Sequence, residues 1–125
     1  MTGGASVDSV QTEGTGAALI WSPCPSEDAA VRIARLLLDE QLIACANIVP
    51  SMMSVFAWQG ETQTERESGL LLKTTDAALD RATARLEQIH PYDAPAIAGW
   101  KVDMAGDATL DWLERTVPHV AGHPS

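Results

Sequence analysis

The main fold signal lies in residues 43–58, IACANIVPSMMSVFAW. This stretch is rich in apolar and β-branched residues, which is typical of a β-strand. Pro50 interrupts it, and a proline inside a strand indicates an edge position or a bulge. The pair Gln59-Gly60 predicts a hairpin turn. A second strand is predicted over Glu65–Thr74, centred on three consecutive leucines, so that the two strands form a hairpin.

The elements on either side of this hairpin repeat one pattern. The apolar run at 17–21 predicts a strand that ends at Pro23-Cys24-Pro25, after which Ser26 is a candidate helix N-cap. Apolar residues at three- and four-residue steps predict a helix on each side of the hairpin. The first of these helices is predicted over about 26–41. The second begins at a cap at Thr75 or Asp76 and ends near His90, because Pro91 follows. A strand over Pro95–Val102 and a short helix capped by Asp107 complete the predicted elements.

The predicted order is strand, helix, strand, strand, helix, strand and a terminal helix. Two βαβ-like halves joined by a hairpin predict an α+β fold. We expect a ferredoxin-like split-βαβ sandwich, with one antiparallel sheet and two helices on one face. The other face of the sheet would expose Leu, Val, Met and Trp side chains, and the sheet edges would be open. We therefore expect an oligomer in which sheets pack on one another.

The composition describes one globular domain. Of the 125 residues, 46 % are hydrophobic and 20 % are charged, which excludes a disordered, collagenous or coiled-coil protein. Large apolar residues are scarce at both ends, so too little surface can be buried there to offset the entropy of ordering. We expect flexible tails at 1–16 and 117–125 around a folded domain at 17–116.

Charge and cysteine content limit the partners and the compartment. The net charge of −9 disfavours binding to nucleic acids and to anionic membranes. The two cysteines, Cys24 and Cys45, are too few for a disulfide framework and fit a reducing compartment. No apolar stretch reaches the roughly 18 residues of a transmembrane helix, and the N-terminus lacks a secretory signal pattern. We expect a cytoplasmic protein.

Five short motifs stand in the order and spacing of a known family. They are Ala44-Cys45-Ala46-Asn47-Ile48-Val49-Pro50, Ser54-Val55-Phe56-Ala57-Trp58-Gln59-Gly60, Glu67 with Leu71-Leu72-Lys73-Thr74, His90-Pro91-Tyr92-Asp93-Ala94-Pro95, and Gly106 with Leu110-Asp111-Trp112-Leu113. The chain thereby resembles the CutA divalent-cation-tolerance proteins, colinearly from about Ala17 to Arg115. The resemblance implies a ferredoxin-like subunit, a tight homotrimer and a role in tolerance of divalent metals, notably copper. It also implies an architecture similar to the PII signalling proteins, which bind small ligands in clefts between subunits.

The resemblance also implies candidate metal ligands. Some family members are credited with copper ligation by a cysteine, which falls on Ser22 here, and by two histidines, which fall on Ile89 and His90. Cys24 is a candidate substitute for the missing cysteine, because residues two apart on an extended segment share a face. Cys24 and His90 are therefore the candidate ligands for copper or another divalent cation. The alternative is that Cys24 is a partly exposed loop thiol and His90 a structural residue at a helix end.

A second candidate site depends on the trimer that the resemblance implies. Trp58, Glu67 and Lys73 lie in the hairpin strands, and Tyr92 and Asp93 lie in a turn between two prolines. Between neighbouring subunits, these five residues would line a cleft with an aromatic wall and a few polar groups, as small-molecule sites do. The alternative is that both aromatic residues are interface packing and that Glu67 and Lys73 form an ion pair.

Motifs for catalysis are absent from the sequence. It holds no nucleophile elbow, phosphate-binding loop or dinucleotide fingerprint, so no catalytic residue is predicted. We interpret the chain as a non-enzymatic homotrimer of metal-ion tolerance, a binding or signalling scaffold that requires no cofactor and has a divalent cation or a small molecule as candidate ligand. Two alternatives stay open: a PII-like sensor or enzyme that uses the intersubunit cleft, and a structural trimer that serves as an interaction platform.

Overall fold

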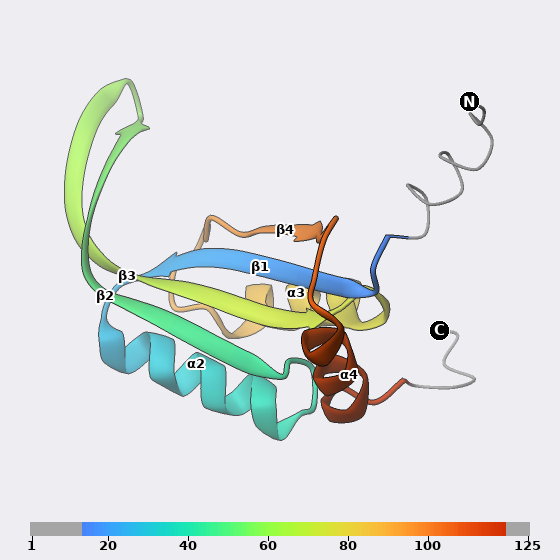
Figure 1. The fold of residues 1–125 in the computed structure, drawn as a ribbon. Coiled ribbons are helices and arrows are strands. Elements are labelled where there is room, and N and C mark those ends of the chain that lie inside the picture. The colour runs from blue at the N-terminus through green and yellow to red at the C-terminus, as the bar shows by residue number, and fades with distance from the viewer. Residues whose placement is uncertain (1–13, 120–125) are drawn as a thin grey trace, which may run out of the picture.

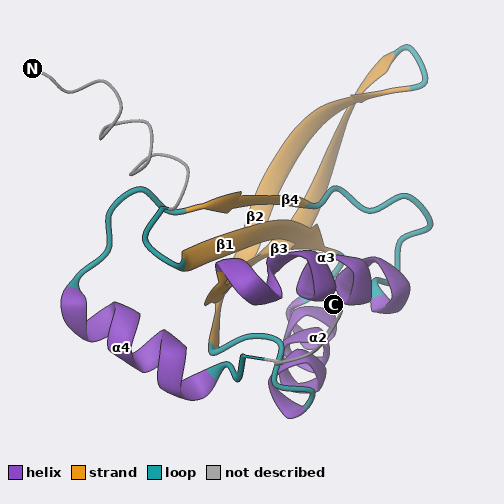
Figure 2. Ribbon diagram, turned by 90° about the vertical axis from the view of Figure 1, so that its right-hand side faces the viewer, coloured by secondary structure: helices purple, strands orange, loops and turns teal. Residues whose placement is uncertain are grey.

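A computed structural model describes residues 14–119 of the chain. One antiparallel sheet has the strand order β2-β3-β1-β4. Helices α2 and α3 lie on one face of this sheet, and α4 packs against β3 at one end of it (Figures 1 and 2). The elements are β1 (Ala17–Cys24), α2 (Glu27–Asp39), β2 (Cys45–Trp58), β3 (Glu61–Thr75), α3 (Asp76–Ile89), β4 (Ala98–Lys101) and α4 (Asp107–Thr116). The predicted α+β class, with two helices on one face of an antiparallel sheet, is confirmed.

Side-chain caps begin the two helices that cover the sheet. The Ser26 hydroxyl accepts a hydrogen bond from the Ala29 N–H at 3.1 Å, and the Thr75 hydroxyl accepts one from the Ala78 N–H at 3.2 Å. Each oxygen satisfies an amide that has no partner within its own helix. Ser26 is the predicted cap, and of the two candidates for the second helix the structure selects Thr75. No helix within residues 14–119 is long and apolar enough to span a membrane.

Several element boundaries differ from the prediction. β3 begins at Glu61, four residues before the predicted start at Glu65, because its pairing with β2 continues up to the turn. β1 continues through Pro23 to Cys24. Its pairing with β4 stops at Trp21, so Pro23 has a neighbouring strand, β3, on one side only in the described sheet. Sheets tolerate a proline at such an edge position. β4 starts only at residue 98; before it, the Ala96 carbonyl accepts a hydrogen bond from the Ser22 hydroxyl at 2.8 Å. The N-cap of α4 is Gly106, and the predicted cap Asp107 lies in the first turn of the helix.

The two expected tails lie mostly outside the described residues, which exclude 1–13 and 120–125. Within the described part, the Thr15 hydroxyl donates to the Val102 carbonyl at 2.7 Å. At the other end, Val117 is buried after the last turn of α4. Packed residues therefore reach slightly past the expected domain limits of 17 and 116.

The hairpin is built from an edge strand, a bulge and a tight turn. β2 is an edge strand, and its pairing with β3 shifts between Val49 and Met52, so that Pro50 lies at an irregularity of the ladder. Pro50 predicted an edge position or a bulge, and the structure has both. Gln59 and Gly60 form the predicted turn, with φ angles of 51° and 81°. Two successive positive φ angles are those of a type I′ turn, whose twist matches the strands that it joins.

The hairpin extends well beyond the rest of the sheet. β1 pairs with β3 only from Ser68 to Thr75, whereas residues 61–67 of β3 pair with β2. Figure 1 shows this part as a curved two-stranded ribbon that rises from the sheet. We call residues 52–67 the hairpin arm. An isolated two-stranded hairpin is at best marginally stable in water, so the arm depends on contacts outside itself.

The hydrophobic core lies between the sheet and helices α2 and α3. Alternate residues of β1 and β3 point toward the helices and are buried, and the strands pair Ile20 with Leu72. The large core side chains are Ile20, Ile33, Leu37, Ile43, Leu70, Leu72 and Leu86. The helices thereby cover one face of the sheet, and the hairpin arm lies beyond this covered part.

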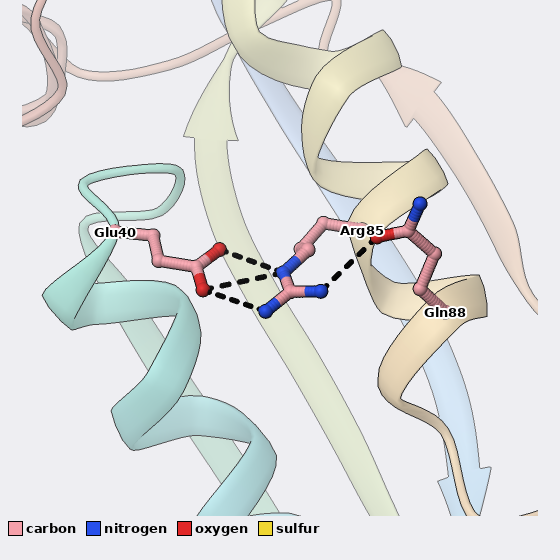
Figure 3. A network of polar contacts seen from close by, with 3 residues as sticks. All are labelled: Glu40, Arg85 and Gln88. Atoms are coloured by element: carbon pink, nitrogen blue, oxygen red, sulfur yellow. Dashed lines mark hydrogen bonds and ion pairs between the residues drawn. The ribbon is translucent and has the colours of Figure 1, made fainter.

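An ion pair joins the two helices at the surface. Nε and Nη2 of Arg85 each donate to the Glu40 carboxylate at 2.9 Å, and Nη1 donates to the amide oxygen of Gln88 at 3.1 Å (Figure 3). The hydrogen bonds from Arg85 hold the pKa of Glu40 below its ordinary value. Because water surrounds the pair, we expect it to add little to the stability of the fold.

On the opposite face of the sheet, the Trp21 indole lies over Gly69. A Cβ atom added at Gly69 would overlap the outer carbons of the indole ring. The register pairs Pro23 with Gly69 and Trp21 with Leu71, so the ring leans diagonally across the strand pair. A glycine is needed here because the ring occupies the space of a side chain.

The Gly69→Ala substitution is expected to lower the free energy of unfolding by about 1–3 kcal/mol, because the added methyl group overpacks against Trp21. Urea unfolding measures this loss. In a Trp21→Leu background the same substitution should cost clearly less, since the smaller side chain leaves room for the methyl group. An equal cost in both backgrounds would contradict the contact.

Candidate functional site

His90 joins three segments at the end of α3. Its Nε2 lies 3.1 Å from the Ser22 hydroxyl and 3.1 Å from the Pro23 carbonyl oxygen, both at the end of β1. Its Nδ1 accepts a hydrogen bond from the Tyr92 N–H at 3.2 Å. Because Nδ1 is an acceptor, the proton of the neutral ring is on Nε2, which donates toward β1. The Ser22 hydroxyl in turn donates to the Ala96 carbonyl at 2.8 Å.

Tyr92 extends this network to the base of the hairpin arm. Its hydroxyl donates to Oε2 of Glu67 at 2.7 Å, and its ring lies 5.2 Å from the His90 ring. Burial raises the pKa of Tyr92, and the hydrogen bond to Glu67 raises it further. The phenol is therefore a permanent donor at neutral pH. Residues 91–96, which we call the 91–96 turn, are thus fixed to β1 through His90 and to the arm through Tyr92.

The predicted metal ligands Cys24 and His90 lie side by side. The Cys24 sulfur is 4.0 Å from Nε2 of His90. Cys24 is fully buried within β1, so its alternative interpretation as a partly exposed loop thiol is wrong. Burial raises the pKa of the Cys24 thiol to about 11, and the charge of Glu67 adds to the rise. The thiol is therefore protonated and unreactive at neutral pH.

This pair does not fit a copper or zinc ion as folded. Such an ion needs a thiolate, an imidazole nitrogen with a free lone pair and usually three or four protein ligands. Here only two candidate ligands meet, and the His90 nitrogen that faces the thiol already donates to Pro23 and Ser22. No group of three or more His, Cys, Asp or Glu side chains within residues 14–119 is placed to hold a metal ion. At the position of the family cysteine, Ser22 supplies a hydrogen-bonding hydroxyl instead.

A cavity of about 600 Å³ opens between the hairpin arm and the 91–96 turn. From the arm it is lined by Ser54, Phe56, Trp58, Gln63, Glu65 and Glu67. From β1 and the turn it is lined by Pro23, Tyr92, Asp93, Ala94 and Ala96. Four residues predicted for a cleft, namely Trp58, Glu67, Tyr92 and Asp93, therefore border one cavity within a single chain.

Lys73, the fifth predicted cleft residue, lies elsewhere. It pairs with Leu19 of β1 and with Cys45 of β2, at the far end of β3 from the arm. Within one chain Lys73 and Glu67 do not form the ion pair of the alternative interpretation, because Glu67 is bonded to Tyr92 and the only salt bridge within residues 14–119 joins Arg85 to Glu40.

Four lining residues that were not predicted from the sequence follow from strand alternation. The register pairs Ser54 with Glu65, two residues along from the pair of Met52 with Glu67, and it pairs Phe56 with Gln63, four residues along. Residues two apart on a strand share a face. Steps of two residues from Glu67 therefore predict Glu65 and Gln63, and steps of two from Trp58 predict Phe56 and Ser54.

Protonation of His90 is expected to destabilise the fold. Burial lowers the pKa of His90 below its ordinary value of 6.5, against the opposing effects of the Pro23 carbonyl and Glu67. As the pH falls below 6.5, the unfolded chain binds more protons than the folded chain, so the free energy of unfolding decreases.

Urea unfolding between roughly pH 7.5 and pH 5 tests this linkage. The free energy of unfolding should fall more steeply with acidification in the wild type than in a His90→Gln variant, which cannot titrate at this position. Parallel pH profiles of the two proteins would show that His90 does not carry the effect.

The chain matches known proteins over most of its length. The family model described as CutA1 divalent ion tolerance protein matches residues 18–116. The divalent-cation tolerance protein CutA of Thermus thermophilus is 42 % identical over 89 residues, which are 71 % of this chain and 86 % of that protein. The match to the family model runs from the second residue of β1 to the last residue of α4.

Two solved structures share the fold. The crystal structure of the divalent ion tolerance protein CutA1 from Ehrlichia chaffeensis aligns with a TM-score of 0.79 at 35 % identity, over 82 % of this chain and 96 % of that one. The protein described as the periplasmic divalent cation tolerance protein CutA from Archaeoglobus fulgidus aligns with a TM-score of 0.77 at 30 % identity, over 82 % and 99 % of the two chains. By its sequence and by its fold, the chain belongs to the CutA1 divalent ion tolerance family.

Proposed function

We propose that this chain forms a homotrimer that serves tolerance of divalent metals, copper among them, as a non-enzymatic scaffold for binding or signalling. The observation that carries the proposal is the apolar surface that a single chain leaves in water. Family membership supports the link to divalent cations, because the relatives are named for tolerance of them.

Large apolar side chains are exposed along the hairpin and beyond β4. Val55 on the arm is 67 % exposed, and Trp100 of β4 is 46 % exposed. Outside the cavity, the set comprises Val49, Met53, Val55, Trp100 and Met104. Exposed apolar surface of this kind is typical of protein interfaces, and the open edge of β2 is a second surface that natural sheets cover. Further copies of the chain would cover both.

The projecting arm suits a closed ring of copies. An arm that reaches past its own sheet can pack on a neighbour while another neighbour packs on it, and such head-to-tail contacts close into a ring. The family resemblance supplies the number three. In a trimer, the arm gains the contacts that a two-stranded ribbon lacks in water.

In this proposal the role in metal tolerance does not pass through Cys24 and His90. The chain carries a net charge of −9, and a trimer carries three times that charge, so divalent cations gather diffusely around it at low ionic strength. Diffuse attraction is not coordination, and the proposed scaffold responds to a ligand rather than storing metal.

We propose a cytoplasmic location because Cys45 is a free, half-buried thiol, which suits a reducing compartment.

A second candidate function is small-ligand sensing, which the cavity beside the arm favours. Its volume of about 600 Å³ and its aromatic and polar lining resemble those of small-molecule sites. Occupancy of the cavity would then be the signal that the scaffold passes on. An interaction platform without a ligand is the simpler alternative.

Light scattering after size exclusion tests the assembly. The wild type is expected at about three times the chain mass of 13.3 kDa. Val55→Glu should give smaller species, because a carboxylate on the arm would have to be buried without a partner. The matched control Ala77→Glu, on the exposed surface of α3, should remain trimeric.

A growth assay connects this assembly to tolerance. In cells that lack their own relative of this chain, the wild type and Ala77→Glu should restore growth at elevated copper, and Val55→Glu should not. A wild type that is monomeric at micromolar concentration would contradict the proposal. Full restoration of growth by a monomeric Val55→Glu variant would contradict it too.

A further inference from the structure

The cavity between the hairpin arm and the 91–96 turn is built for one class of ligand. We infer that it binds a small organic cation, a molecule with an ammonium or guanidinium group on an apolar body. The inference rests on the proposed ligand-binding role and deepens it by naming the class of ligand. Its support comes from the lining side chains and the spread of their charges.

Aromatic rings form part of the cavity wall. Phe56 and Trp58 stand two residues apart on β2, so both rings lie on the face of the arm that borders the cavity. Phe56 is 37 % exposed and Trp58 is 51 % exposed, so both rings are open to a ligand. Tyr92 contributes a third ring from the turn. Aromatic faces carry negative potential and attract ammonium and guanidinium groups.

Every charged side chain that lines the cavity is acidic. Glu65 and Glu67 come from β3, Asp93 comes from the turn, and no Lys or Arg is among the lining residues of the described chain. The Tyr92 hydroxyl binds Oε2 of Glu67, which fixes this carboxylate and leaves Oε1 for a ligand. A nucleotide or an organic acid would meet three negative charges, so the cavity disfavours anionic ligands.

The same carboxylates do not form a metal site. Within residues 14–119, no three His, Cys, Asp or Glu side chains converge on one point as metal ligands. Magnesium and calcium need about six or more oxygen ligands around a single centre. Here the carboxylates are distributed around a cavity of about 600 Å³ that aromatic rings also line. This arrangement suits an extended molecule that carries positive charge.

Isothermal titration calorimetry of the full chain tests the inference. The probes are choline, agmatine and spermidine, each paired with a neutral analogue in which carbon or a hydroxyl replaces the charged nitrogen. We expect at least one cation to bind at one site per chain, and its neutral analogue to bind roughly tenfold more weakly or not at all.

Variants locate the site. Trp58→Ala and Glu65→Gln should each weaken binding by roughly tenfold, because they remove an aromatic face and a carboxylate from the cavity. Glu65→Gln leaves the hydrogen bond between Tyr92 and Glu67 intact, so weaker binding by this variant would not be caused by the loss of that contact. The matched control Glu114→Gln removes the same charge from the exposed surface of α4 and should leave the affinity unchanged.

Light scattering on the same samples gives their mass, so a failure of this inference can be distinguished from a failure of the proposed trimer. A trimer that binds none of the three cations overturns the inference and leaves the proposed assembly standing. A monomer that binds a cation supports the inference and removes the proposed assembly. Equal affinity for a cation and its neutral analogue, or equal loss in Glu65→Gln and Glu114→Gln, would also overturn the inference.

Discussion

The length of the hairpin relative to the rest of the sheet is the constraint on which the structure depends. β3 has 15 residues and β1 has 8, so residues 61–67 of β3 pair with β2 beyond the end of β1. A ribbon of two strands cannot bury both of its faces. The exposed apolar side chains of the arm and the proposed need for further copies follow from this excess of length. It also provides one wall of the cavity, because the arm curves away from the sheet (Figure 1).

The hydrogen-bond network around His90 determines where the other wall lies. Both ring nitrogens of His90 have partners, one at the end of β1 and one in the backbone of Tyr92. Tyr92 then reaches Glu67 at the base of the arm. A buried polar network holds its geometry when every member is satisfied, so the 91–96 turn is fixed against the arm. The histidine that the family resemblance marks as a metal ligand connects the end of α3 to β1 and to the backbone of Tyr92 in this structure.

Local chemistry made much of the fold predictable from the sequence. Pro50 restricts its own strand whatever surrounds it, so the edge position and the bulge could be predicted. The continuation of β1 through Pro23 could not, because it depends on how far β4 pairs beside it. At the site, Glu67 and Lys73 stand an even number of residues apart on β3, so strand alternation places both on the same face. Lys73 lies outside the cavity because it is at the other end of the strand, and a motif match alone does not predict that. Whether the His90 ring can bind a metal ion depends on its hydrogen bonds to the Pro23 carbonyl and the Tyr92 N–H, and no sequence pattern predicts these bonds.

Hydrogen–deuterium exchange of the hairpin arm tests most directly whether the arm is ordered by contacts outside its own chain. The amides of residues 52–67 should exchange slowly at concentrations where the chain is assembled. In a monomeric sample they should exchange much faster, while the amides of β1 and α2 stay protected because their core lies within one chain. Slow exchange of the arm in a monomer would contradict this account, because the two-stranded ribbon would then be stable alone.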